Sequence, residues 1–313
     1  MKLELDGLTK EFGDFTAVNH INLTMTNGVY GLLGVNGAGK TTLMRMLCTL
    51  LKPTSGTICC NGKDIFSMDS EYRKLLGYLP QDFGFYPEFT VEDYLLYIGA
   101  LKGIRPIVAK KRVKELIAKV GLSKVAHKKM KKLSGGMKRR AGIAQAMLNN
   151  PKILILDEPT VGLDPKQITE IRNLIRELGK THTIILSSHI LSEVSQICNK
   201  VIIINKGKLV AIDTPENLEN KVSNKNCVYV TVEDPENKME KIQSKITEIE
   251  KLELIEKNED GTKQYMLESK DGVDLRKILF TELAKEGITI FEMKKADSTL
   301  EDAFMKIIEG GNN

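Results

Sequence analysis

The chain has no tryptophan, few other aromatic residues and no long apolar run, and each absence excludes a class of protein. Aromatic residues make up 5% of its 313 residues and do not interleave with basic side chains, as they do in proteins that stack on nucleic-acid bases. The longest apolar runs, at residues 153–156 and 201–204, are far shorter than the ~18 residues of a membrane span. Residues 1–6 lack the apolar core of a signal peptide. We therefore expect a cytoplasmic protein, and nucleic acid is disfavoured as its partner.

The five cysteines have no spacing that would hold a metal ion. Their odd number and the lack of a pairing framework indicate reduced thiols. Cys48 and Cys198 lie in apolar helical patterns, which favours a role as small core residues.

Charge is spread unevenly along the chain. Residues 221–313 carry 15 Lys and Arg against 20 Asp and Glu, whereas residues 1–220 carry 31 against 21. The change of sign indicates two units. The basic excess is densest between Lys110 and Arg140, where it forms either a solvated helix face or a surface close to anionic lipid.

A glycine-rich segment is the most informative part of the chain. Residues 34–42 fit the pattern Gly-x4-Gly-Lys-Thr, and lie between an apolar strand-like segment and a helical pattern. Such a loop directs several backbone N–H groups and the positive end of a helix dipole at one point, which therefore binds phosphate. Lys40 is placed to reach the β- and γ-phosphates of a nucleotide, and Thr41 to hold Mg²⁺. We expect the whole loop to take part: Gly34, Val35, Asn36, Gly37, Ala38, Gly39, Lys40, Thr41 and Thr42.

Two carboxylates end a second apolar run. Asp157 and Glu158 follow residues 153–156, and a carboxylate at the carboxyl end of a strand beside a phosphate loop suits Mg²⁺. Neighbouring side chains leave a strand in opposite directions, so the two carboxylates have different roles. We assign Asp157 to the metal and Glu158 to polarising the water that attacks the γ-phosphate.

A third segment, Ser134-Gly135-Gly136, opens a helical pattern that runs to residue 148. Ser134 can cap this helix and the glycines leave its N-terminus accessible. The segment is either a second anion site or an ordinary helix start.

The order of elements predicts an α/β domain followed by a smaller α+β domain. Apolar runs at 152–157, 183–187 and 201–205 alternate with helical stretches and are typical of parallel strands buried on both faces, and residues 205–208 form a hairpin turn. The pattern loosens between Pro215 and Asn226. We place the domains at 1–217 and 218–313, with a helical subdomain over residues 83–150.

The second domain shows a ferredoxin-like order, β-α-β-β-α-β. The pattern predicts a strand at 228–232, a helix at 238–251, a hairpin through Asp260 and Gly261, a helix at 273–286, a strand at 288–293 and a last helix at 300–308. Ser298 and Glu301 have the spacing of a capping box for the last helix.

Over residues 1–215 the chain resembles the ATP-binding-cassette (ABC) family, whose seven motifs it carries in order. Residues 34–42 match the phosphate loop and residues 153–158 the second nucleotide motif. Residues 133–137 match the signature Leu-Ser-Gly-Gly-Gln, except that Met137 replaces the glutamine. Four further residues occupy positions of the family's motifs. Phe12 matches the aromatic residue that stacks on adenine in the family, and Gln81 matches the loop glutamine that senses Mg²⁺ and the attacking water. Asp164 matches the loop at the dimer interface, and His189 matches the switch histidine that contacts the γ-phosphate.

The resemblance implies a P-loop ATPase fold with a mixed sheet and a helical subdomain, and ATP and Mg²⁺ as cofactors. It implies a head-to-tail dimer, of two copies or of paralogues, in which the Ser134 segment of one subunit closes on the nucleotide of the other. The implied catalytic residues are Lys40, Gln81, Glu158 and His189, and the metal ligands are Thr41, Gln81 and Asp157. The implied nucleotide-binding residues are Phe12, the loop 34–42, Ser134, Gly135, Gly136 and Asp164.

A single cassette without a membrane span implies a separate transmembrane permease and peripheral association with the inner face of the membrane. With its small acidic tail, the chain is similar to the ATPases of bacterial exporters for peptides, antibiotics or lipids. Residues 83–89 contain four aromatic residues, which form either a groove for a permease helix or a local core. The alternatives are a soluble family member that acts on ribosomes or DNA, and a regulatory nucleotide binder, against which Glu158 argues.

Overall fold

The computed structural model describes residues 1–222, 227–234, 238–258, 261–270, 273–295 and 299–310. The chain divides into two compact units. The first comprises Met1–Pro215 with Ile307–Asn313, and the second comprises Glu216–Lys306. The predicted limit after residue 217 falls inside helix α9 (Pro215–Val222), and we keep the limits 1–217 and 218–313 as a proposal.

A six-stranded sheet forms the centre of the first unit, in the order β10-β9-β3-β8-β7-β6. Strands β3, β6, β7, β8 and β9 pair in parallel. The edge strand β10 instead pairs antiparallel with β9 through the predicted turn at 205–208. The parallel strands are buried on both faces, so the prediction from the apolar runs is confirmed. The strands are β3 (Gly28–Leu33), β6 (Leu76–Leu79), β7 (Ile153–Asp157), β8 (Thr183–Ser187), β9 (Lys200–Asn205) and β10 (Lys208–Asp213).

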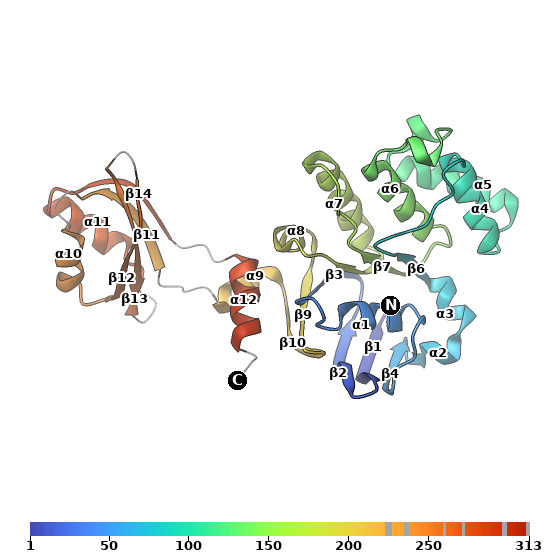
Figure 1. The fold of residues 1–313 in the computed structure, drawn as a ribbon, viewed down its shortest axis with the longest axis horizontal. Helices are drawn as coiled ribbons and strands as arrows, with labels where there is room; N and C mark the ends of the chain where they lie inside the picture. Colours follow the sequence, from blue (N-terminus) through green and yellow to red (C-terminus); the bar gives the residue numbers. More distant parts are fainter. Residues whose placement is uncertain (223–226, 235–237, 259–260, 271–272, 296–298, 311–313) are drawn as a thin grey trace. The chain divides into compact units, whose positions relative to one another are not determined.

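A second, antiparallel sheet and helix α1 (Lys40–Leu47) complete the core of this unit. The sheet has the order β2-β1-β4-β5, with β1 at Leu3–Phe12, β2 at Phe15–Met25, β4 at Ser55–Cys60 and β5 at Lys63–Asp64. One apolar cluster joins this sheet to the parallel sheet and to the buried side of α1. The helix that follows the phosphate loop is therefore fixed by packing on both sheets (Figure 1).

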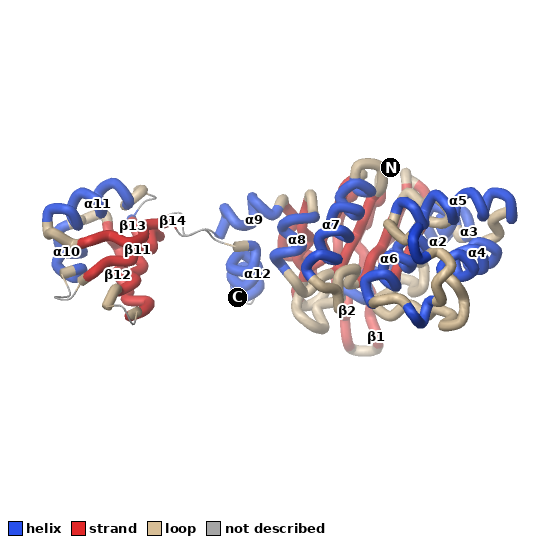
Figure 2. The backbone as a smooth tube through the Cα atoms, turned by 90° about the horizontal axis from the view of Figure 1, so that it is seen from above, coloured by secondary structure: helices blue, strands red, loops and turns tan. Residues whose placement is uncertain are grey.

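The remaining helices surround the parallel sheet. Short helices α2 (Ile65–Met68) and α3 (Ser70–Leu75) precede β6, and α7 (Pro165–Gly179) and α8 (Leu191–Ile197) follow β7 and β8. Helices α4 (Val91–Leu101), α5 (Pro106–Lys119) and α6 (Gly135–Ala146) contact one another and form a helical group (Figure 1, Figure 2).

The aromatic residues of the loop before α4 pack mainly on each other. Tyr86 stacks on Phe89 with ring centroids 5.0 Å apart, and Tyr97 of α4 meets both rings edge-on. Phe83 lies close to Gly142 of α6. The four rings of residues 83–89 form a local cluster, in which Tyr86 is 47% exposed and Phe83, Phe85 and Phe89 are half-buried.

The second unit has the predicted ferredoxin-like order. Its antiparallel sheet has the order β12-β13-β11-β14, and its apolar face packs against both helices (Figure 2). The elements are β11 (Cys227–Glu233), α10 (Met239–Lys245), β12 (Ile249–Lys257), β13 (Lys263–Ser269), α11 (Arg276–Lys285) and β14 (Thr289–Lys295).

The helix predicted over 238–251 is wrong in its second half. Helix α10 ends at Lys245, and residues from Ile249 onward form β12, which pairs with β13. The segment is rich in Glu and Lys, which favour helix. Pairing with β13 and packing of Ile249 and Leu252 in the core outweigh that local preference.

The start of the last helix, α12 (Leu300–Gly310), also differs from the prediction. Ser298 lies outside the described residues. The reciprocal contacts of a capping box are made one position later, where the Thr299 hydroxyl accepts from the Asp302 N–H and the Asp302 carboxylate accepts from the Thr299 N–H.

The buried hydroxyl of Tyr72 leads to a prediction about the stability of the first unit. Tyr72 has no exposed surface, and its hydroxyl donates to the carbonyl of Leu47, the last residue of α1, at 2.9 Å. Replacing Tyr72 with Phe leaves this carbonyl unsatisfied and should lower the free energy of unfolding by about 1–3 kcal/mol, measured by urea denaturation. Tyr97→Phe is the control, because the Tyr97 hydroxyl contacts the exposed Tyr86 hydroxyl, which water can replace. Equal losses in both variants would contradict the role of the buried bond.

Candidate functional site

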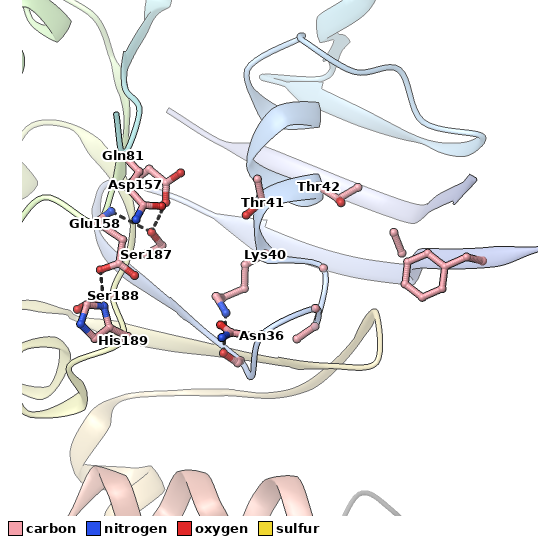
Figure 3. A pocket seen from close by; sticks show the side chains of 16 residues that line it. Asn36, Lys40, Thr41, Thr42, Gln81, Asp157, Glu158, Ser187, Ser188 and His189 are labelled. Carbon is pink, nitrogen blue, oxygen red and sulfur yellow. Dashed lines mark hydrogen bonds and ion pairs between the residues drawn. The ribbon is translucent and has the colours of Figure 1, made fainter. Parts of the chain in front are cut away.

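One cavity of the first unit, of about 340 Å³, gathers most of the residues predicted from the sequence. It lies at the carboxyl ends of β3, β6, β7 and β8, where parallel strands place their following loops side by side. The phosphate loop forms one wall, and the residues after β6, β7 and β8 form the wall that faces it (Figure 3). The predicted residues that line it are Gly34, Asn36, Gly37, Ala38, Gly39, Lys40, Thr41, Thr42, Gln81, Asp157, Glu158 and His189.

Two glycines of the loop are required by close backbone contacts. A Cβ atom on Gly34 would lie 2.4 Å from the Ile204 carbonyl oxygen, and one on Gly39 would lie 2.3 Å from that of Ala17. Gly39 also has a φ of +104°, which side chains disfavour. The loop thus sits tightly against its neighbours, and its residues and the start of α1 line the cavity.

Lys40 is the cation of the loop. Its Nζ donates to the carbonyl oxygens of Gly34 at 2.6 Å and Val35 at 3.1 Å. Burial lowers the pKa of Lys40, and the carboxylates of Glu158 and Asp157 act in the opposite direction. A partly buried ammonium held by neutral carbonyls keeps its charge available to an anion.

Asp157 is the last residue of β7 and Glu158 follows it, and both are held by Ser187, the last residue of β8. The Ser187 hydroxyl donates to Asp157 Oδ1 at 2.5 Å and accepts from the Glu158 N–H at 3.0 Å. Glu158 has a φ of +51°, a strained conformation for a residue with a side chain, which costs on the order of 1 kcal/mol. Its Oε2 lies 2.9 Å from His189 Nδ1, so a carboxylate and an imidazole form a pair on this wall (Figure 3).

Several lining residues were missed by the sequence analysis: Phe15, Ala17, Ser187 and Ser188. Phe15 pairs with Phe12 across the hairpin between β1 and β2, and it is Phe15, 61% exposed, that lines the cavity. The Phe12 ring is 50% exposed, and the Lys10 Nζ lies 5.2 Å from its centroid. The assignment of adenine stacking to Phe12 stays a prediction.

Four of the other predicted nucleotide-binding residues, Ser134, Gly135, Gly136 and Asp164, lie together at the starts of α6 and α7. Ser134 caps α6, since its hydroxyl accepts from the Met137 N–H at 3.3 Å, and Asp164 caps α7 by accepting from the Gln167 N–H at 2.9 Å. A Cβ atom on Gly136 would lie 1.9 Å from Gln167 Oε1. The starts of these two helices are therefore in contact. Of the predicted residues, those that do not line the cavity are Phe12, Val35, Ser134, Gly135, Gly136 and Asp164.

The chain is similar to known proteins over this whole arrangement. A family model described as ABC transporter matches residues 18–161. The bacitracin transport ATP-binding protein BcrA of Bacillus licheniformis is 38% identical over 307 residues, which cover 97% of this chain and 96% of that protein. The chain belongs to the family of ABC transporter ATP-binding proteins. As a member of this family it binds ATP and is an ATPase.

Solved structures of ABC ATP-binding proteins confirm the P-loop ATPase fold. The protein cbiO1 of Clostridium perfringens, part of the ABC transporter complex cbiONQ, is 30% identical with a TM-score of 0.64, over 69% of this chain and 89% of that chain. The ATP-binding cassette MJ0796, dimeric and bound to ADP and Pi in a post-hydrolysis state, is 25% identical with a TM-score of 0.59, over 68% of this chain and 98% of that chain. A shorter match to an AAA domain model, described as putative AbiEii toxin, Type IV TA system, covers residues 128–195.

Lys40 provides the first test of the site. Replacing Lys40 with Ala removes the cation from the loop and should lower ATP affinity by about 100-fold or more, because charge-assisted hydrogen bonds to the phosphates are lost. The measurement is a titration with a fluorescent ATP analogue. Lys63→Ala, in the exposed strand β5, is the control and should bind as the parent does. Unchanged affinity in the Lys40 variant would remove the assignment of the phosphate loop.

Proposed function

We propose that the cavity binds ATP with Mg²⁺ and hydrolyses the γ-phosphate, and that the energy drives a membrane exporter. The observation that carries the proposal is the placement of Lys40 and the phosphate loop opposite Glu158, which is paired with His189 (Figure 3). Cation and backbone N–H groups on one wall hold the triphosphate, and a carboxylate on the other wall directs the attacking water.

Oxygen atoms of Thr41, Gln81 and Asp157 would hold the Mg²⁺. All three residues line the cavity. Within the described ranges no group of three or more acidic, histidine or cysteine side chains could bind a metal alone, which fits an ion that takes the rest of its ligands from phosphate and water. Its chemical contribution is to neutralise charge on the phosphates.

The protein groups account for the chemical step. Lys40 exchanges the carbonyls of Gly34 and Val35 for phosphate oxygens. Glu158 accepts a proton from water as the water oxygen bonds to the γ-phosphorus and the bond to the β-phosphate oxygen breaks, so that ADP and phosphate leave. His189 holds the Glu158 carboxylate through Nδ1 and offers its other ring nitrogen to the γ-phosphate.

The second nucleotide contact comes from another subunit. Ser134 and Gly136 lie at the start of α6 and do not line the cavity of their own chain, although a capped N-terminus suits an anion. The MJ0796 cassette, with the same fold, is dimeric with ADP and Pi. We therefore assign the Ser134 segment to the nucleotide of a second copy or a paralogue, with Asp164 beside it.

Glu158 tests the proposed chemistry. Replacing Glu158 with Gln keeps the shape of the side chain but removes its capacity to take a proton, so ATP turnover should fall by about 100-fold or more while ATP binding remains. The variant should also form an ATP-dependent dimer, measured by size-exclusion chromatography with light scattering. Glu177→Gln is the control, because Glu177 pairs with Lys180 on an exposed face of α7. Undiminished turnover in the Glu158 variant would rule out its role as the base.

A second cleft of the first unit suits a transmembrane partner. It has a volume of about 580 Å³ and combines apolar residues with a basic rim. Leu50 and Leu101 are more than half exposed there, and Arg73, Lys74 and Lys102 lie beside them. An apolar helix with acidic side chains, presented by a permease at the inner face of the membrane, matches this surface. BcrA is a transport protein by name, and the comparisons give no support to the ribosome or DNA alternative.

No helix within the described residues is long and apolar enough to span a bilayer. The double change Lys74→Glu and Leu101→Ser should reduce co-purification of the permease from detergent extracts by about tenfold. The measurement is the ratio of permease to tagged ATPase on a gel, and the melting temperature checks folding. Lys63→Glu carries the same charge reversal outside the cleft. Loss of the permease in both variants, or in neither, would exclude the cleft as the docking site.

A further inference from the structure

Arg139 is a buried cation at the centre of the first unit that no motif assigned. It lies on α6, little more than one turn after the Ser134 cap, and is 7% exposed. Its Nη1 donates to the carbonyl oxygens of Pro80 at 3.2 Å and Gln81 at 2.8 Å. Its Nη2 donates to the carbonyl of Glu158 at 2.5 Å and to that of Asp157.

The acceptors come from the ends of two neighbouring strands. Pro80 and Gln81 follow β6. Asp157 ends β7 and Glu158 follows it, and β7 pairs with β6 in parallel. A planar guanidinium with a donor fork on each side can join two such backbone segments, whereas an ammonium cannot span both. One side chain of α6 thus fixes the segment that carries Gln81 and the segment that carries Glu158.

A contribution to the stability of the fold does not explain why a charged residue is buried at position 139. Burial lowers the pKa of its guanidinium, against the effect of the carboxylates of Asp157, Glu158 and Asp82. Its Nε is buried and has no hydrogen-bond acceptor among the described residues. Replacing such buried charges by apolar residues is often neutral or stabilising in proteins, so the position is better explained by what the guanidinium holds.

Arg139 also holds the strained backbone of Glu158, the proposed catalytic carboxylate. Glu158 has a φ of +51°, and a conformation of this kind persists only where its surroundings fix it. Ser187 binds its N–H, and Arg139 binds its carbonyl. The direction of the Glu158 side chain toward His189 therefore depends on Arg139 and Ser187 together.

We propose that Arg139 is a positioning residue that couples the two nucleotide sites of the dimer. The inference rests on the proposed function, because it takes the Ser134 segment to contact the partner's nucleotide. Arg139 ties that segment, through α6, to Gln81 and Glu158 of its own site. A displacement of either catalytic group on ATP binding is then transmitted to the helix presented across the interface. Met137 lacks the polar group usual in the signature, and Arg139, two residues later, supplies the polar link.

The test compares Arg139→Lys and Arg139→Met with the parent. Both variants should keep the affinity for a fluorescent ATP analogue within about threefold, since the phosphate loop is untouched. The kcat for ATP should fall by about 10- to 100-fold, less for Lys than for Met, because the catalytic groups are misplaced rather than removed. The Hill coefficient for ATP should fall from above one toward one, as coupling between the sites is lost.

Arg112→Lys is the matched control. Arg112 of α5 donates through Nη2 to the Met147 carbonyl, at 3.0 Å, just after the other end of α6. The same chemical change there should leave kcat and the Hill coefficient within about twofold of the parent. All assays are run well below the melting temperature of each variant, measured in parallel.

Dimerisation of the Glu158→Gln variant distinguishes failure of the proposed function from failure of the coupling role of Arg139. If Glu158→Gln forms no ATP-dependent dimer, the proposed function fails. If it does, adding Arg139→Lys should weaken ATP-dependent dimerisation by about tenfold at unchanged nucleotide affinity. Equal dimerisation with and without Arg139→Lys, or an unchanged kcat and Hill coefficient in the Arg139→Lys protein, would overturn the coupling role. A loss of kcat only in step with unfolding would overturn it as well.

Discussion

The parallel pairing of β3, β8, β7 and β6 is the constraint on which the site depends. Because these strands run in one direction, the loops that follow them emerge at one edge of the sheet. That edge receives the phosphate loop from β3, Gln81 from β6, Glu158 from β7 and His189 from the segment after β8. Helix α1 is fixed between two sheets by the apolar cluster around it, so its N-terminus points at the same place.

Backbone carbonyl oxygens, rather than carboxylates, bind the two cations nearest to the proposed catalytic groups, Lys40 and Arg139. Lys40 donates to the carbonyls of Gly34 and Val35, and Arg139 donates to carbonyls at the ends of β6 and β7. A neutral acceptor orients a cation without cancelling its charge. Lys40 therefore remains attractive to a phosphate, and Arg139 keeps a fixed position while the carboxylates beside it stay available for water and metal.

In the proposed dimer, the starts of α1 and α6 bind different nucleotides. The start of α1 faces the cavity of its own chain, whereas the start of α6 lies against the start of α7. A single chain of the proposed dimer holds only half of each complete site, and closure would require a second cassette. Binding of ATP between the halves stabilises the closed form, and cleavage of the γ-phosphate removes the contacts that held it.

The sequence alone determined those parts of the site that are formed by contiguous residues. The phosphate loop, the Asp157-Glu158 pair at a strand end and the cap Ser134 are local, because N–H groups, glycines and neighbouring side chains act within a few positions. The ferredoxin-like order of the second unit was likewise predictable from its alternating elements. Only the start of β12, residues 249–251, was taken for helix, since strand pairing with β13 depends on residues far along the chain.

Contacts between residues that are far apart in the sequence were decided only by the tertiary structure. Phe15 instead of Phe12 lines the cavity because the β1–β2 hairpin turns that side chain toward the loop. Ser187 holds Asp157 and Glu158 across a strand pair, and Arg139 reaches from α6 to two strand ends. No spacing in the sequence marks these contacts, since sheet order and helix packing, not chain position, bring the atoms within hydrogen-bond reach.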